Sequence, residues 1–363
     1  MKRKLSIKKI SIFILSLVIL TIITLCMVYN MNLKAVSKKS IEVEFEIGSG
    51  NTYYTIANKL KNEGLIRNEF CYKLYLKFNR PSVALGAGIY KLNKNMSVKT
   101  LIKSLSSKNS RDPNAVTLTF KEGKNIRWMA SYIANNTNNT EEDVFNLLKD
   151  QNYLKELINK YWFLTDEILN PNIYYSLEGY LYPETYDFKN KDVSVKDIFN
   201  TLLEEEDKRL TSIKSDIEKN SYTIHQLLTL ASVVELEAGK SNDKPGIAGV
   251  FYNRLDNNMP LGSDVTTYYA AKIDLSDRDL TIQEVNAVNS YNTRSASMAG
   301  KLPVGPICSP TIDTIKAVLN KEDNEYFYFV ADKNGKTYFT KNYAEHTAKV
   351  AELKKNGLWY VYE

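Results

Sequence analysis

The chain opens with a long apolar run and then changes to amphipathic patterns. No charged residue lies between Ile10 and Leu33, and roughly 20 apolar residues suffice to cross a bilayer as a helix. Lysine and arginine are denser before this run than after it. The positive-inside rule therefore predicts a cytosolic tail over 1–9, a membrane anchor over 10–31 and an outward-facing remainder. A cleaved signal peptide is the alternative, but its apolar region is normally shorter, about 7–15 residues.

After a linker over 32–40, short alternating and helical patterns predict a compact α+β unit over 41–108. Polar and apolar residues alternate in the first predicted strand, the second is glycine-flanked, and helical patterns lie between and after them. The predicted strands cover 41–47 and 88–92, and the predicted helices cover 69–78, 98–105 and a pattern that opens at 54–60 and ends near Gly64. A polar linker over 106–114 then separates this unit from the rest.

The patterns over 115–363 predict a larger mixed domain, so the fold class is α+β with one transmembrane helix and a small N-terminal subdomain. A strand is predicted at 116–120, a hairpin at 326–331 and 336–339, and helices at 126–134, 141–150, 195–218, around Glu235, at 246–257 and at 311–319. Residues 259–310 are polar and show little periodicity. So long an irregular stretch in a compact domain is usually functional.

Composition excludes several classes of chemistry. There are two histidines and no Cys-x-x-Cys, which argues against a zinc site. No phosphate-binding glycine motif is present, and the net charge of +6 is spread along the chain, unlike a nucleic-acid-binding surface. We therefore expect no metal, no cofactor and no nucleic-acid partner. Whether Cys71 and Cys308 pair is left open by their spacing.

Carboxylate chemistry remains, and its first candidate is Glu235. On a helical wheel this residue lies between Leu228, Ala231 and Ser232. A carboxyl among apolar neighbours has a raised pKa and can serve as a general acid. The alternative is that Glu235 only caps its helix. Glu237 lies about 200° away on the wheel, so we expect a structural or supporting role for it.

Polar clusters follow this helix in a definite order. Two of them contain Ser263 and Asp264, and Tyr291, Asn292 and Thr293. Taken one by one, such clusters are typical of turns and caps.

Together with other stretches, they resemble the membrane-anchored endolytic murein transglycosylases, the YceG-like family. The matching stretches are 177–186, 231–235, 250–255, 263–264, 291–293, 302–307 and 328–332. The chain departs from the usual pattern at several accessory positions, among them Val265 and Arg294.

The resemblance implies a lytic mechanism, a LysM-like fold for 41–108 and Glu235 as the catalytic residue. Protonated Glu235 would cleave the bond between N-acetylmuramic acid and N-acetylglucosamine and leave 1,6-anhydro ends. Ser263, Asp264, Tyr291, Asn292 and Thr293 become candidates for holding the sugars. The implied partners are peptidoglycan strands, the membrane and peptidoglycan synthases. The resemblance also implies that cleavage by this enzyme ends the growth of new strands.

Other functions stay open at this stage. A hydrolytic muramidase would use Asp264 together with Glu235, since hydrolytic glycosidases usually need two carboxyls. A non-catalytic wall-binding protein or a scaffold that recruits partners would need neither residue.

Overall fold

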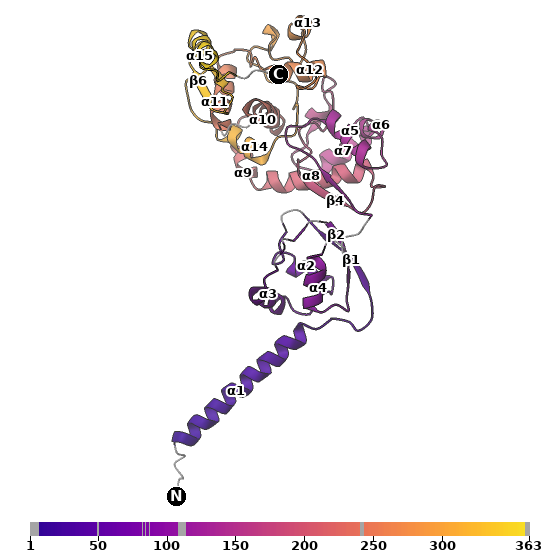
Figure 1. Cartoon of the computed structure of the whole chain (residues 1–363). Coiled ribbons are helices and arrows are strands. Elements are labelled where there is room, and N and C mark those ends of the chain that lie inside the picture. The colour runs from indigo at the N-terminus through magenta and orange to yellow at the C-terminus, as the bar shows by residue number, and fades with distance from the viewer. Residues whose placement is uncertain are drawn as a thin grey trace. The chain divides into compact units, whose positions relative to one another are not determined.

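The computed structural model describes residues 7–48, 51–81, 83, 85–86, 88–107, 114–239 and 243–359, with side chains of the first helix from residue 13 onward. It divides into two compact units (Figure 1). One comprises 1–118 with 185–191, and the other comprises 119–184 with 192–363. The start of the predicted cytosolic tail and residues 108–113 of the predicted linker lie outside the described residues.

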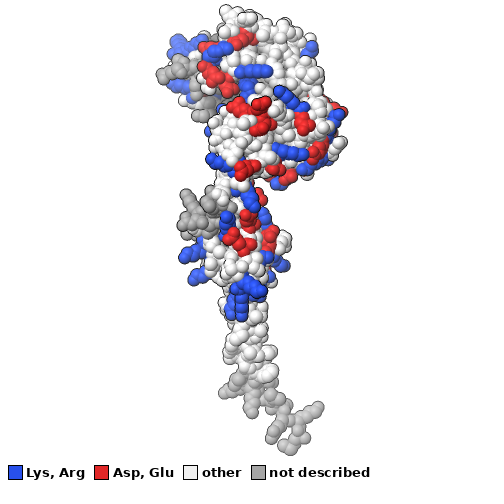
Figure 2. All heavy atoms as spheres, turned by 90° about the vertical axis from the view of Figure 1, so that its right-hand side faces the viewer, with Lys and Arg blue, Asp and Glu red and all other residues white. Residues whose placement is uncertain are grey.

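Helix α1 (Ile7–Asn32) is the apolar run recognised in the sequence. Its segment Phe13–Asn32 is long and apolar enough to cross a membrane, and none of it is buried against the protein. Figure 2 shows the described part of this helix without charged side chains, whereas charges of both signs are interspersed over the rest of the visible face. An exposed apolar helix of this length is typical of a membrane anchor.

The rest of the first unit consists of paired strands that pack against short helices. Strands β1 (Glu42–Ile47) and β2 (Gly88–Asn93) are antiparallel, with Phe45 opposite Tyr90. Strands β3 (Val116–Thr119) and β4 (Thr185–Phe188) form a second pair. The helices are α2 (Ala57–Asn62), α3 (Glu69–Phe78) and α4 (Val98–Leu105). Their apolar faces and β1–β2 enclose one core.

The second unit is mainly helical. Its first half contains α5 (Ile126–Asn136), α6 (Glu141–Leu147), α7 (Gln151–Lys160), the 3₁₀ turn η2 (Asp166–Leu169), α8 (Val195–Thr211) and α9 (Lys214–Lys219). Its second half contains α10 (Ile224–Ala238), α11 (Lys244–Asp256), α12 (Asp264–Ala271), α13 (Ile282–Val285), η3 (Ala296–Met298), α14 (Ile312–Leu319), the hairpin β5 (Tyr328–Ala331) and β6 (Thr337–Thr340), and α15 (Tyr343–Lys355).

Helix α10 is the central element of the second unit. It begins at a capping box in which Thr223 and Gln226 satisfy each other's backbone N–H groups. It ends before Gly239, whose φ is +53°. Apolar residues surround most of the helix, as expected for one that is buried on nearly all sides. It packs against α11, α12 and α14, so its few polar side chains are placed among these neighbours.

Two predicted helix boundaries are wrong, and helix α12 was not predicted. The helix predicted over 195–218 is two helices, because the Ser212 hydroxyl donates to Arg209 O and the buried Ile213 leaves helical geometry. The helix predicted over 141–150 ends at Leu147, and Asp150 caps the unpredicted α7. The region 259–310 contains α12, whose β-branched residues are weak helix formers that are stabilised by burial.

Cys71 and Cys308 are both free and buried, in different units. They do not form a disulfide in this structure.

Candidate active site

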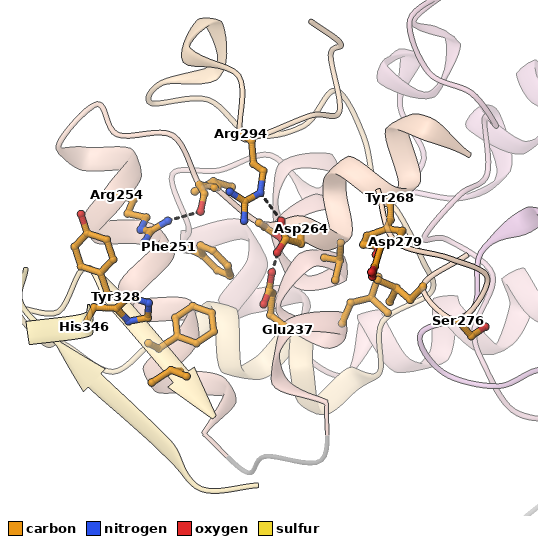
Figure 3. Close-up of a pocket in the computed structure, with 18 of the residues that line it drawn as sticks. Glu237, Phe251, Arg254, Asp264, Tyr268, Ser276, Asp279, Arg294, Tyr328 and His346 are labelled. Carbon is orange, nitrogen blue, oxygen red and sulfur yellow. Dashed lines mark hydrogen bonds and ion pairs between the residues drawn. The ribbon is translucent and has the colours of Figure 1, made fainter. Parts of the chain in front are cut away.

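A pocket in the second unit has a volume of about 1150 Å³. Ligand pockets for compact small molecules usually measure roughly 300–1,000 Å³, so an extended ligand fits here. In Figure 3, Glu237, Asp264 and Arg294 lie between two groups of lining residues. One group contains Arg254, Tyr328 and His346, and the other contains Tyr268, Ser276 and Asp279.

Glu237, on the last turn of α10, brings an acid into the middle of this pocket. Its Oε1 accepts a hydrogen bond of 2.5 Å from the Ser263 hydroxyl. Burial is the largest influence on this carboxyl and raises its pKa, and the nearby charge of Asp264 raises the pKa further. The hydrogen bond from Ser263 and the charges of Arg254 and Arg294 lower the pKa, but the net direction is upward. Glu237 is therefore suited to hold a proton and donate it to a ligand.

Asp264 is the second carboxyl of the pocket. It is the first residue of α12, and it forms an ion pair with Arg294. Its side chain is 58% exposed, so it faces the open part of the cavity. The pocket thus combines an acid whose pKa is raised and an ion-paired carboxylate, and two carboxyls are what glycoside chemistry commonly uses.

Glu235 lies on the other side of α10, as the helical wheel predicted, and it is not among the residues that line the pocket. Its Oε1 accepts 3.0 Å from Lys244 Nζ at the start of α11. Its Oε2 accepts 2.9 Å from Thr311 N, at the N-terminus of α14, and is also bonded to the Thr314 hydroxyl. This carboxylate joins three helices.

The expected rise in the pKa of Glu235 is wrong. Burial does raise it, but the hydrogen bonds from Thr311 and Thr314 and the charge of Lys244 outweigh burial, and the pKa lies below its ordinary value of 4.5. The N-terminus of a helix also favours an anion. Glu235 is thus held as a carboxylate near neutral pH and has little tendency to donate a proton.

Of the predicted sugar-holding residues, Ser263 and Asp264 line the pocket and the other three do not. Tyr291, Asn292 and Thr293 are fully buried. The Thr293 hydroxyl accepts 3.1 Å from Ser263 N, and Asn292 Oδ1 accepts 2.8 Å from the Thr267 hydroxyl. These contacts fix the start of α12, and thereby the positions of Ser263 and Asp264.

Glu178 supports the same helix from the opposite direction. Its buried carboxyl accepts 3.1 Å from Ile126 N at the start of α5 and 2.9 Å from the Tyr269 hydroxyl on α12. Burial raises the pKa of Glu178 to about 7. The carboxyl therefore connects two helices without contacting the pocket.

Sequence reasoning did not single out Arg254, Tyr268, Tyr328 or His346 as pocket residues. Arg254 and Tyr328 lie within stretches that matched the family pattern, which is the one signal that pointed to them. His346 lies outside those stretches. Among the described residues, no cluster of His, Cys, Asp and Glu could hold a metal ion.

Comparison with known proteins identifies the family. The model of the YceG-like family matches residues 45–352, most of the chain. The chain belongs to the YceG-like family. The endolytic murein transglycosylase of Bacillus subtilis (strain 168) is 34% identical over 317 residues, which cover 86% of each chain. The endolytic murein transglycosylase of Streptococcus pneumoniae (strain D39) is 32% identical over 336 residues, which cover 88% of this chain and 59% of that protein.

The fold of this family member also matches a crystal structure. A YceG-like protein of Listeria monocytogenes superimposes with a TM-score of 0.61 at 30% identity, covering 86% of this chain and 100% of that one. The mixed α+β architecture described above is thus shared with a solved member of the family.

Proposed function

We propose that this chain cuts the glycosidic bonds of peptidoglycan strands, with Glu237 as the proton donor. Family membership makes the chain an enzyme of the endolytic murein transglycosylase type, as its curated relatives are named. The observation that carries the choice of residue is the environment of Glu237, a half-buried carboxyl with a raised pKa that lines a pocket of about 1150 Å³. The sequence alone had assigned this role to Glu235.

In the proposed reaction, protonated Glu237 donates to the glycosidic oxygen between N-acetylmuramic acid and N-acetylglucosamine. The bond from that oxygen to C1 of the muramyl residue breaks. The Glu237 carboxylate then accepts the proton of the muramyl C6 hydroxyl, whose oxygen attacks C1. The products are a 1,6-anhydromuramyl end and a free 4-hydroxyl, and no water is consumed. One carboxyl suffices because the nucleophile belongs to the substrate.

The neighbours of Glu237 support these steps. The Ser263 hydroxyl orients the carboxyl through its hydrogen bond, and Asp264 offers negative charge to the oxocarbenium-like centre from the pocket wall. We assign Asn292 and Thr293 to positioning the start of α12 and Tyr291 to packing on Tyr269 of the same helix, rather than to sugar contacts, since all three are buried.

The test is mass spectrometry of purified glycan strands after incubation with the full chain in detergent micelles. The wild type should release fragments with anhydromuramyl ends, the Glu237→Gln variant should release none, and the Glu235→Gln variant should keep the activity. Activity that survives in Glu237→Gln but is lost in a folded Glu235→Gln would return the catalytic role to Glu235.

Hydrolysis is the second candidate, and Asp264 is the observation that favours it. A second carboxyl lines the same pocket and could activate water or stabilise an intermediate, as in hydrolytic glycosidases. Digestion in heavy-oxygen water separates the two reactions, because hydrolysis places one solvent oxygen at each new reducing end and the lytic reaction places none. Asp264→Asn should abolish hydrolysis but only slow the lytic reaction.

The rest of the proposal concerns location. We assign the membrane-spanning role to α1 with the catalytic unit outside the cell, and a LysM-like, glycan-gripping role to 41–108. An enzyme anchored there would cut new strands close to the membrane, beside the synthases that make them, and would end their growth. Labelling of single cysteines introduced at Ser6 and Ser107 with an impermeant reagent in whole cells tests the topology, since only the second should react.

A further inference from the structure

One end of the pocket is formed by Arg254, Tyr328 and His346, from α11, β5 and α15 (Figure 3). We call this group the Arg254 end. The guanidinium carbon lies 5.0 Å from the centroid of the Tyr328 ring, and the Tyr328 and His346 rings are stacked with centroids 5.5 Å apart. A cation and two aromatic rings thus form a layered wall next to the acid.

The Arg254 guanidinium is fixed in place without being neutralised. Nε donates 2.6 Å to Phe327 O, and Nη1 donates to Leu261 O. Both acceptors are uncharged carbonyls, and the guanidinium has more N–H donors than these two bonds use. Arg254 takes part in no ion pair within the described part of the chain, whereas Arg294 and Arg278 in the same pocket are paired.

An unpaired cation in a partly buried place is costly. Burial lowers the pKa of Arg254, and Tyr328 and Glu237 are the groups that favour its charge. Glu237 gives little compensation while it holds a proton. The Arg254 guanidinium therefore has unused N–H donors and an unpaired positive charge, and an anionic ligand would satisfy both.

His346 completes this wall as a neutral ring. Burial and the charge of Arg254 lower its pKa, which favours the uncharged imidazole near neutral pH. Nδ1 is buried and has no hydrogen-bond partner among the described residues, so stacking on Tyr328 rather than a hydrogen bond holds the ring. A flat, weakly polar surface of this kind suits the apolar face of a sugar.

We propose that the Arg254 end binds a carboxylate carried by the muramyl residues of the strand, and that this contact selects muramyl glycan over neutral amino-sugar polymers. The inference rests on the proposed function and names the substrate group that the cation recognises. Each muramyl residue bears a lactyl ether, whose carboxyl is free in a naked strand and is joined to a stem peptide otherwise. Stem peptides bring carboxylates of their own, and a guanidinium recognises either source.

The experiment compares substrates that differ only in charge. Full-length protein in detergent micelles is given naked strands, peptide-bearing strands, and the same strands after their carboxyls have been converted to neutral amides. KM and kcat are measured for the wild type, Arg254→Gln, Arg254→Lys and His346→Gln. Arg209→Gln is the matched control, because Arg209 also lies 5.0 Å from a tyrosine ring but is paired with Glu205 and does not line the pocket.

We expect Arg254→Gln to raise KM for the carboxylate substrate about 10- to 100-fold with a smaller change in kcat, as for a lost charge-assisted hydrogen bond. Amidation of the substrate should raise the wild-type KM by a similar factor, and the variant should then lose nothing more. Arg254→Lys should recover part of the affinity, and Arg209→Gln should behave as the wild type. The naked and peptide-bearing strands show which carboxylate is bound. Loss of affinity when the naked strands are amidated indicates the lactyl carboxylate, and loss when the peptide-bearing strands are amidated indicates a stem-peptide carboxylate.

Equal KM values for charged and amidated strands with the wild type would overturn the inference, whatever the variants do, because amidation leaves the protein's fold untouched. So would equal losses in Arg254→Gln on both substrates. Failure of the proposed function has a different signature, namely no cleavage of any strand by the wild type. In that case, calorimetry still tests the carboxylate contact. It compares the binding of a muramyl dipeptide and of its amidated form to the Glu237→Gln protein.

Discussion

The two sides of helix α10 carry one glutamate each, and the chain treats them in opposite ways. Glu235 and Glu237 stand two positions apart on the same buried helix, and burial raises the pKa of both. On one side, Lys244, Thr311 and Thr314 donate to Glu235, and its pKa is lowered. On the other side, the Ser263 hydroxyl donates to Glu237, Asp264 adds negative charge, and the pKa is raised.

The difference teaches that burial alone does not make a general acid. The pKa of a buried carboxyl depends on how many donors and cations reach its charged form. Glu235 occupies the N-terminus of α14 and stabilises the packing of three helices. The charged form of Glu237 is poorly compensated in the middle of a pocket, and such a perturbed pKa is typical of functional sites.

The largest difference between the two glutamates is expected when each of them is replaced by glutamine. Glu237→Gln keeps size and polarity but has no acidic proton, so kcat should fall about 10²- to 10⁴-fold, and Glu235→Gln should lower kcat by less than about tenfold. Release of soluble fragments from glycan strands measures both. Equal loss in two variants that keep the wild-type unfolding temperature would contradict the division of roles.

Stability should show the reverse order. Glu235→Gln removes the ion pair with Lys244, whose side chain is only 21% exposed, and weakens the bonds to α14. We expect a loss of roughly 1–3 kcal/mol in the free energy of unfolding. Denaturant titration in detergent micelles, followed by tryptophan fluorescence, checks this. Glu237→Gln is the matched variant and should cost less, and a larger cost for it would show that Glu237 is the structural residue.

The two variants should also differ in opposite directions with pH. Glu235 has a lowered pKa, so its stabilising effect is present above about 4.5 and is lost as the pH falls through the folded-state value. Glu237 has a raised pKa, so the wild type loses stability relative to Glu237→Gln as the pH rises from about 4.5 through the folded-state value. Unfolding temperatures across an acid-to-neutral series measure both trends. Parallel curves for the two variants would mean that the two carboxyls share one environment.

The smallest effect is expected at Ser263. Its hydroxyl stabilises the charged form of Glu237, so Ser263→Ala should raise the pKa of the acid and move the alkaline limb of the rate profile to higher pH. The rate at the optimum should fall by less than about tenfold, since the carboxyl loses one orienting contact. Thr267→Ser, which keeps a buried hydroxyl on the same helix, is the control. A limb that stays in place would remove Ser263 from the acid's environment.

Local sequence patterns predicted much of the secondary structure. The apolar run of α1 and the alternation in β1 were both readable along the chain. Helix α12 was not, because Val265, Thr266 and Thr267 favour strands and are helical here through burial. The break between α8 and α9 near Ser212 was equally hidden from the sequence, since it depends on the burial of Ile213 in the folded protein.

By itself the sequence determined that this protein has an apolar helix long enough to cross a membrane, an α+β fold, a YceG-like pattern and a helix with two acids on opposite sides. Those properties follow from spacing and composition, which a linear chain displays. Tertiary structure alone decided which acid meets the pocket, because that depends on α11, α12 and α14, whose residues lie far from α10 in sequence. It supplied Lys244, Thr311 and Thr314 to one carboxyl and a cavity to the other. A pKa is set by such neighbours in space, and no helical wheel contains them.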